Sequence, residues 1–198
     1  IVAHLCAAII AWFKGDAPLM LDAAQKVLDL ANEANHPFGI RTTLCLLAQA
    51  EFKLGHYEQA LSAGQASYDL AAQQGDRAVQ GLTALNVLAK LAYARGDYDE
   101  AQRWGQDALR CFEELREPFT LATATVMLTA CALARGDFPE AQKQLNGCLQ
   151  LLERVGLVWQ IPAMLLRIAR LLAERQMTDP AVAVLALVLH HPDCRKTT

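Results

Sequence analysis

An aromatic register runs through this sequence at one fixed distance before a recurring glycine. Its members are Trp12, Phe52, Tyr93 and, as an aliphatic fourth, Leu133. Rings spaced in this way predict a ladder along a groove, where they would hold the apolar side chains of a peptide or the face of a sugar. The alternative is that these rings only pack adjacent helices against one another.

A polar pair accompanies the register. Asn86 and Lys90 are four residues apart, so on a helix they share one face. Together with Gln49 they could hydrogen-bond the backbone or a carboxylate of a peptide. The alternative is that all three are solvated polar residues of a groove.

Catalytic and metal-binding patterns lack their minimal parts. The sequence contains no G-x-x-x-x-G-K-[ST], no G-x-S-x-G and no H-E-x-x-H. The five histidines are dispersed, and none stands with Cys, Asp or Glu at ligand spacing. We therefore expect no enzymatic activity, no cofactor and no metal.

Charge and hydropathy exclude two classes of partner. The 198 residues carry a net charge of -3 without a cluster of Lys and Arg, so we expect no direct binding of nucleic acid. The longest apolar runs, 1–13 and 181–189, are shorter than the ~20 residues of a spanning helix, so we expect no membrane segment. The chain opens without a basic n-region or a small-residue cleavage site, so we expect no signal peptide and a cytoplasmic protein.

The six cysteines form no C-x-x-C pair. Five of them fall within helical patterns, where a free cysteine behaves as a small buried hydrophobe. Their arrangement favours a reduced setting over disulfides or metal binding.

The marker glycines reveal a repeat. Gly15, Gly55, Gly96 and Gly136 lie 40, 41 and 40 residues apart, and a fixed period of this length is typical of a stacked helical array. The best-formed marker, Gly96-Asp97-Tyr98-Asp99-Glu100-Ala101, recurs in altered form at 136–141 and 55–60. A weaker copy begins at Gly15.

Apolar residues on both sides of each marker follow the i, i+3, i+4 rule of an amphipathic helix. The glycine is expected to end one helix with a positive φ, and Asp97 and Asp137 are expected to cap the next helix. Twenty residues after each marker comes a second break, at Asn35, Gly75, Arg116 or Gly156. The predicted helix pairs are 1–14 and 17–34, 38–54 and 57–74, 78–95 and 98–115, 119–135 and 138–155, and 158–175 and 179–190. In the last pair Gln176 holds the place of the glycine.

These markers resemble the tetratricopeptide (TPR) consensus. The resemblance includes Leu88-Ala89 before the turn and an aromatic, an acidic residue and an alanine after it, such as Tyr57, Glu58 and Ala60. The usual TPR is 34 residues long, and the longer units here resemble the superhelical domain of bacterial ATP-dependent transcriptional activators of the maltose-regulator type. The resemblance implies an all-α, right-handed superhelical solenoid of about five antiparallel helix pairs. We expect one TPR-like domain over 1–198, with units at about 1–37, 38–77, 78–118, 119–157 and 158–190 and a tail at 191–198.

A solenoid of this type presents a concave surface lined by the first helix of each pair. The groove positions predicted on this basis are Trp12; Thr42, Cys45, Gln49 and Phe52; Thr83, Asn86, Lys90 and Tyr93; and Thr123, Val126, Ala130 and Leu133.

Both ends of the array are apolar on more than one side, whereas a solenoid normally ends with a polar face. The chain also begins at Ile1 without an initiator Met. We therefore expect a piece of a larger protein that covers these ends, and self-association through them is the alternative.

Three functions fit these features. The first is a non-catalytic scaffold module that binds a protein or peptide within a larger, bacterial regulatory protein. The second is a sensor domain whose superhelix closes on a small effector such as an oligosaccharide and switches an attached ATPase. The third is a structural spacer or self-association arm.

Overall fold

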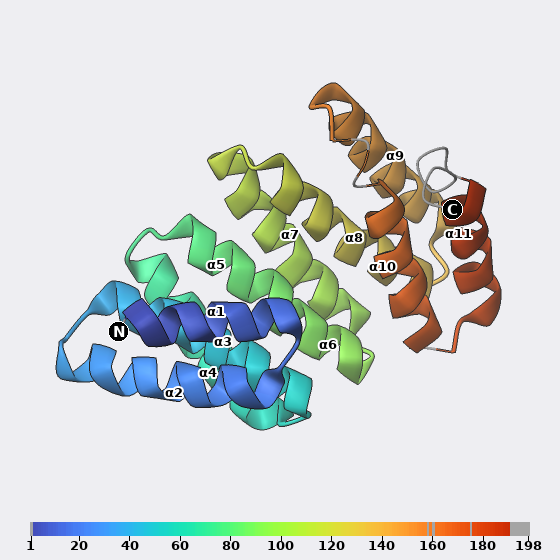
Figure 1. The fold of residues 1–198 in the computed structure, drawn as a ribbon. Coiled ribbons are helices and arrows are strands. Elements are labelled where there is room, and N and C mark those ends of the chain that lie inside the picture. Colours follow the sequence, from blue (N-terminus) through green and yellow to red (C-terminus); the bar gives the residue numbers. More distant parts are fainter. Residues whose placement is uncertain (1, 158, 160, 175, 191–198) are drawn as a thin grey trace. The chain divides into compact units, whose positions relative to one another are not determined.

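The computed structural model describes residues 2–157, 159, 161–174 and 176–190, and these form helices joined by short turns, with no strand among them (Figure 1). The predicted all-α fold is confirmed. The chain divides into two compact units, Ile1–Arg95 and Gly96–Thr198. The predicted tail at 191–198, with Cys194, lies outside the described residues.

Unit 1 is a stack of helix hairpins in which α1 packs on α2, α2 on α3, and α3 on α4 (Figure 1). Its last helix, 77–95, has three segments. The elements are α1 (Val2–Lys14), α2 (Ala17–Glu33), α3 (Pro37–Leu54), α4 (Tyr57–Gln73), α5 (Arg77–Thr83), the π-helix η1 (Ala84–Leu88) and α6 (Ala89–Arg95).

Unit 2 is built in the same way, with α8 packed between α7 and α9 and also against α10, which pairs with α11. Its elements are α7 (Tyr98–Leu115), α8 (Pro118–Ala134), α9 (Phe138–Arg154), α10 (Ile161–Glu174) and α11 (Thr178–His190). In both units the helices follow the predicted pairs closely; α7, for example, occupies the predicted 98–115.

Residues with positive φ recur along the chain at an almost constant interval. They are Gly15, Asn35, Gly55, Gly75, Gly96, Arg116, Gly136, Gly156 and Gln176. Each follows a helix, and at most of them the next N–H donates to a carbonyl five residues earlier, as Asp76 does to Ala71 over 2.8 Å. The predicted second breaks are confirmed, and Gln176 (φ 59°) takes the left-handed conformation although it is not a glycine.

One interval differs from the others. Neighbouring positive-φ residues are 20 positions apart, except Gly75 and Gly96, which are 21 apart. The helix between these two glycines contains η1, where the Ala89 N–H donates to the Ala84 carbonyl five residues earlier. A π-helical turn holds one residue more than an α-helical turn, so the extra residue of this interval lies inside the helix. The sequence pattern predicts a regular helix over 78–95, without this bulge.

Helix N-termini are capped largely as predicted. Asp97 Oδ1 accepts the N–H of Glu100 at 2.9 Å, and Asp137 Oδ1 accepts that of Glu140 at 3.1 Å. His36 was not predicted to act as a cap, but its Nδ1 accepts the N–H of Gly39 at 3.0 Å. These caps satisfy N–H groups that have no partner within their own helix.

Glycines also allow close helix packing. A Cβ on Gly64 in α4 would lie 2.8 Å from Val87 Cγ1 in η1, and a Cβ on Gly105 in α7 would lie 2.9 Å from Leu128 Cδ2 in α8. Small residues at these positions let neighbouring helices approach, which is consistent with a core rich in fully buried alanines.

Candidate binding faces

The predicted groove residues of unit 1 are joined by hydrogen bonds between successive first helices. Trp12 Nε1 on α1 donates to Gln49 Oε1 on α3 at 2.8 Å, and Gln49 Nε2 donates to Cys45 Sγ at 3.2 Å. The Trp12 side chain is held in this way while 37% of the residue stays exposed. The structure thus brings Trp12 and Gln49 together across two helices, and the sequence did not predict this bond.

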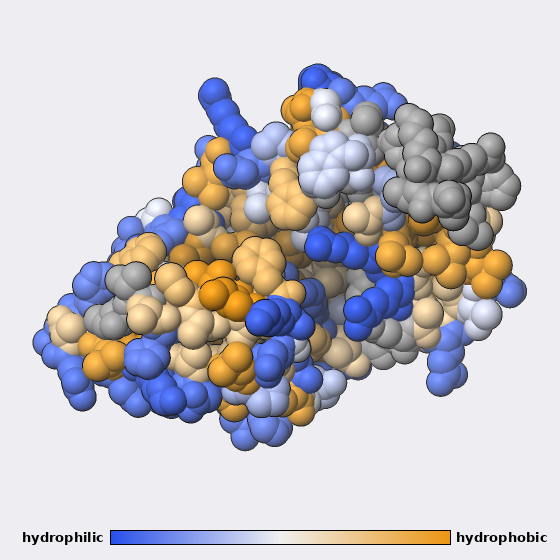
Figure 2. Space-filling model, in the orientation of Figure 1, coloured by the Kyte–Doolittle hydropathy of each residue, from blue (hydrophilic) through white to orange (hydrophobic). Residues whose placement is uncertain are grey.

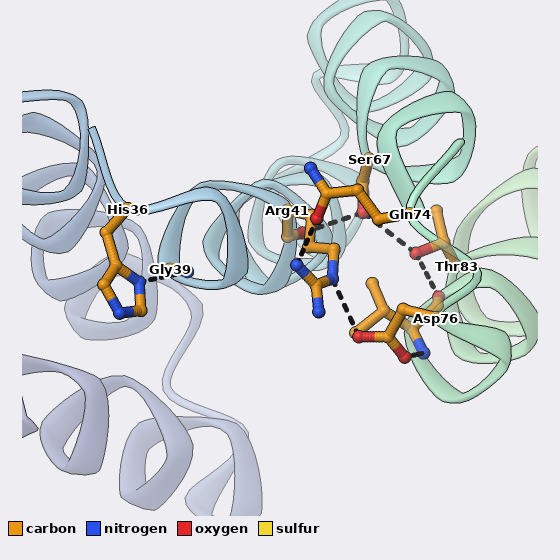
Figure 3. Close-up of polar contacts among 8 residues, drawn as sticks. His36, Gly39, Arg41, Ser67, Gln74, Asp76 and Thr83 are labelled. Atoms are coloured by element: carbon orange, nitrogen blue, oxygen red, sulfur yellow. Dashed lines mark hydrogen bonds and ion pairs between the residues drawn. The ribbon is translucent and has the colours of Figure 1, made fainter. Parts of the chain in front are cut away.

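The network continues inward to Thr83, which is fully buried. The Cys45 thiol is hydrogen-bonded to Thr83. Thr83 Oγ1 donates to the Val79 carbonyl oxygen at 2.8 Å and lies 3.1 Å from Ser67 Oγ of α4. Burial raises the pKa of the Cys45 thiol against the smaller opposing effects of its hydrogen bonds. Thr83 of α5 is therefore linked to α4 through Ser67 (Figure 3) and to α3 through Cys45.

A half-buried ion pair lies beside this network. Arg41 Nε of α3 donates to Asp76 Oδ2 at 2.7 Å, and the two side chains are only 13% and 15% exposed. Arg41 also bonds Gln74 Oε1, and Ser67 Oγ donates to the Arg41 carbonyl (Figure 3). Burial disfavours the charged Asp76 carboxylate, but hydrogen bonds from the Val79 N–H and from Arg41 outweigh it and lower the pKa of Asp76. The pair fixes the start of α5 on α3.

The aromatic register is only partly exposed. Tyr93 is 3% exposed. Phe52 is half-buried and packs on the cluster of Ala48, Ala60, Val87 and Leu91, with its ring centroid 5.7 Å from that of Tyr57. Of the three rings, Trp12 thus presents the largest surface, and a ligand-binding role for the register stays a prediction.

Asn86 and Lys90 lie as the sequence predicted, on one side of the 77–95 helix. Lys90 Nζ donates to Asn86 Oδ1 at 3.1 Å, and both residues are half-buried. On α3, the buried Thr42 Oγ1 has no hydrogen-bond partner among the described residues. Asn86 and Lys90 therefore form a half-buried polar pair among the predicted groove residues of unit 1.

In unit 2 the predicted groove residues are mostly apolar and buried. Val126 and Ala130 are buried in α8, and the half-buried Leu133 packs on the cluster that contains Val126. A hollow of about 30 Å³ lies between α8 and α10, with Phe119, Thr123, Val126, Met164 and Arg167 in its lining. Because this volume matches roughly one water molecule, the hollow as it stands does not hold a larger ligand.

A larger hollow on the other side of α8 was not predicted. It has a volume of about 450 Å³ and lies among α7, α8 and α9, with Glu113, Thr125, Lys143, Gln144 and Gly147 in its lining. The sequence signal was Gly147, a glycine inside a helix, where an added Cβ would have no atom within 4 Å.

Other chemistry is sparse in the described part of the chain. Its residues contain no group of three or more His, Cys, Asp or Glu side chains that could hold a metal. Cys45, Cys111, Cys131 and Cys148 are buried free thiols, whereas Cys6 is exposed. Burial raises the pKa of Cys131 to about 12 and that of Cys148 to about 11, so neither is a reactive thiolate near neutral pH. None of the described helices combines the length and hydropathy of a membrane span.

The comparisons with known proteins agree with this architecture. The family model for the MalT-like TPR region matches residues 1–196. The chain belongs to this family. No curated protein matches the sequence of this MalT-like TPR region at a significant level.

Solved structures share the fold at low sequence identity. Aspartyl phosphate phosphatase F from Bacillus subtilis superposes with a TM-score of 0.70 at 16% identity, covering 91% of this chain and 56% of that one. A Rap protein complexed with Competence and Sporulation Factor gives 0.70 at 16%, with 92% and 60% covered. TPR-like repeats of a putative kinesin light chain from Podosopora anserina give 0.66 at 15%, with 94% and 92% covered. The MalT-like TPR region thus spans less than two thirds of the first two of these proteins.

Proposed function

We propose that this chain is a non-catalytic module that binds a protein or peptide, as part of a larger, cytoplasmic regulatory protein of a bacterium. The observation that carries the proposal is the Trp12 ring, which stays exposed while Gln49 of the next first helix holds it in place. An aromatic side chain that is ordered before binding loses little conformational entropy on binding, and such rings are frequent anchors of protein interfaces.

Polar residues on the next first helix support the same function. Asn86 and Lys90 are half-buried residues of the 77–95 helix, and side chains of this kind form hydrogen bonds with a peptide backbone. The similar fold of a Rap protein complexed with Competence and Sporulation Factor adds support, since a chain of this architecture holds a separate partner there.

The effector-sensing alternative finds less support in the geometry. Stacking on an oligosaccharide would use Trp12, Phe52 and Tyr93 together, and Tyr93 is 3% exposed while Phe52 packs against Tyr57. A single exposed ring suits one side chain of a peptide better than an extended sugar.

Selection from a displayed library of random 12-residue peptides tests the proposal. Peptides that bind the wild-type chain should lose affinity by about tenfold or more with Trp12→Ala, because truncating an aromatic anchor commonly costs at least about 1–2 kcal/mol. Trp159→Ala is the matched control, since Trp159 is also exposed but lies in unit 2. Failure to select any peptide, or equal losses in both variants, would count against the proposal.

A second candidate function, self-association, rests on the outer side of α1. Ile9, Ile10 and Phe13 are exposed there, Phe13 by 77%, and hydrophobic residues gather over α1 on the face drawn in Figure 2. Exposed apolar patches of this kind mark interaction surfaces. Sedimentation velocity should detect a concentration-dependent dimer that Phe13→Asp removes and Phe138→Asp, on α9, leaves intact. A monomer at every concentration would contradict it.

A further inference from the structure

Gly147 is a glycine in the middle of α9 that the packing of the described residues does not require. Gly64 and Gly105 let neighbouring helices approach, because a Cβ there would lie 2.8 Å or 2.9 Å from a side chain of the next helix. A Cβ on Gly147 would have no atom within 4 Å. Since a glycine inside a helix costs about 1 kcal/mol relative to alanine, the missing side chain at this position needs another explanation.

The other repeats carry a side chain at the equivalent position. Gly147 follows its marker Gly136 at the same distance at which Lys26, Ala66 and Asp107 follow theirs, and all four residues lie within second helices. The helix backbone at this position therefore does not require glycine. A glycine also lets another group approach the backbone closely, and Gly147 lines the hollow of about 450 Å³ among α7, α8 and α9.

This hollow has the size and the apolar wall of a small-molecule site. Ligand pockets commonly measure about 300–1,000 Å³ and are lined largely by hydrophobic side chains. Leu109 of α7, Leu121 of α8 and Leu151 of α9 line the hollow, and all three are half-buried. One leucine from each of three helices thus offers apolar surface to the body of a ligand.

The polar groups on the α9 side of the hollow leave an acceptor for a ligand. Glu140 accepts from Gln144 Nε2 at 2.6 Å and lies 3.6 Å from Lys143 Nζ, so it engages both donor groups of this side. The amide oxygen of Gln144 remains as an acceptor. Lys143 and Glu140 together carry no net charge.

The α7 side adds a negative charge. Glu113 lines the hollow and is exposed. Among the described residues neither Arg110, which pairs with Asp107 at 2.8 Å, nor Arg116 forms an ion pair with Glu113. The hollow therefore combines an apolar wall with a carboxylate and an amide oxygen, and a cation that donates hydrogen bonds complements these acceptors.

We propose that the hollow among α7, α8 and α9 binds a small amphipathic amine. The apolar body of the ligand lies on the three leucines and against the backbone of Gly147, and its ammonium group pairs with Glu113. The Gln144 amide oxygen accepts from a further N–H of the ligand. This site lies in unit 2 and does not depend on the proposed function, whose residues lie in unit 1.

Titration of matched amines and alcohols tests the proposal. Tryptamine and tryptophol, phenethylamine and phenethyl alcohol, and octylamine and octanol each share one apolar body, and each compound is titrated against the whole 198-residue chain. The amines should shift the backbone N–H resonance of Gly147. They should bind about tenfold more tightly than their alcohols, as expected of a hydrogen bond to a charged group.

Glu113→Gln tests the role of the charge. This isosteric variant should lower the affinity for the amines by about tenfold, to that of the alcohols, while the alcohols bind as before. Glu153→Gln is the matched control, because Glu153 is an exposed carboxylate of α9 that does not line the hollow.

Gly147→Leu tests the role of the open space. The added side chain occupies the hollow, so amines and alcohols should both lose binding. The variant should be at least as stable as the wild type, because leucine favours a helix more than glycine does, and thermal unfolding followed by circular dichroism checks this. Asn146→Leu is the control, because Asn146 is the exposed neighbour of Gly147 outside the hollow.

Three results would overturn the proposal. The first is that the amines do not shift the Gly147 resonance or bind no more tightly than their alcohols. The second is unchanged amine binding in Glu113→Gln, and the third is unchanged binding in a folded Gly147→Leu variant. If Gly147→Leu does not fold, Glu113→Gln still decides, because it changes one exposed side chain. None of these results bears on peptide binding through Trp12.

Discussion

The 77–95 helix and α8 are the first helices of successive repeats, but they differ in their internal structure and in their N-caps. The 77–95 helix of unit 1 and α8 of unit 2 both precede a glycine with positive φ. Arg95 is the last residue of the first helix and Arg135 directly follows α8, and each pairs with an acidic residue after the previous marker glycine. Arg95 lies 3.3 Å from Glu58 and Arg135 lies 2.8 Å from Asp99. The C-terminal ends of the two helices are therefore equivalent.

Their middles and their beginnings differ. The 77–95 helix contains the extra residue, the π-turn and the polar Asn86–Lys90 pair, and its N-cap Asp76 bonds both Val79 N and Arg41. The shorter α8 is regular, and its N-cap Glu117 makes no capping bond with its side chain. An insertion was thus accommodated in the helix interior, while the turns kept their geometry. The turn positions satisfy several backbone groups at once, so changing them costs more than one widened helical turn.

The largest expected effect that separates the two helices comes from their N-caps. Asp76→Ala should lower the free energy of unfolding by about 3 kcal/mol, because it removes a cap and leaves Arg41 without its carboxylate. Glu117→Ala should change it by less than about 0.5 kcal/mol. Urea unfolding followed by circular dichroism gives both values. Equal effects would show that the Arg41–Asp76 pair does not fix the bulged helix.

The same pair has a pH signature. The pKa of Asp76 is lower in the folded than in the unfolded chain, so its contribution is present above the unfolded value of about 4 and is lost as pH falls through the folded value. Between pH 5 and pH 3 the wild type should therefore lose more stability than Asp76→Asn. A parallel loss in the two proteins would contradict this assignment.

Packing against the bulge gives the next largest effect. Gly64→Ala places a methyl group 2.8 Å from Val87 Cγ1, a β-branched side chain with little freedom to move, and should cost about 2 kcal/mol. Gly105→Ala meets the end of the flexible Leu128 side chain in α8 and should cost about 1 kcal/mol or less. Gly147→Ala is the control, since the open space around it predicts a gain of about 0.5–1 kcal/mol. Thermal unfolding would rank the stabilities of the three variants. A larger loss for Gly105→Ala than for Gly64→Ala would show that η1 accommodates an added methyl group more easily than α8 does.

The ends of both helices could be predicted from the sequence, because the residues of each turn determine its conformation. Gly96, Asp97 and their counterparts each determine a helix end through their own backbone and caps, so the helix bounds were predicted well. The 41-residue spacing between Gly55 and Gly96 was also visible, but it does not say where the extra residue lies. That is decided by tertiary packing around Leu85, Val87 and Gly64.

Candidate site residues were harder to predict, for a physical reason. Their register was read from Gly96 and its counterparts, which fixes a position along the helix but not the depth of a side chain in a stack. Trp12 and Lys90 reach the surface, whereas Thr83 and Tyr93, which were also predicted to line the groove, are buried. The Trp12–Gln49 bond joins residues 37 positions apart and had no local signal.

The smallest effect concerns the turns that lead into the two helices. Gly75 precedes the bulged helix and Arg116 precedes α8, and both have positive φ, 69° and 56°. A side chain with a Cβ is strained in this conformation, whereas glycine is not, although glycine loses more entropy on folding. Arg116→Gly should therefore stabilise unit 2 by about 0.5 kcal/mol, and Gly75→Ala should destabilise unit 1 by about 1 kcal/mol. Urea midpoints that move in opposite directions would confirm that the two turns have the same geometry and differ only in how well the residue fits it. A loss of stability in Arg116→Gly would instead mean that the arginine side chain contributes more at this turn than its backbone strain removes.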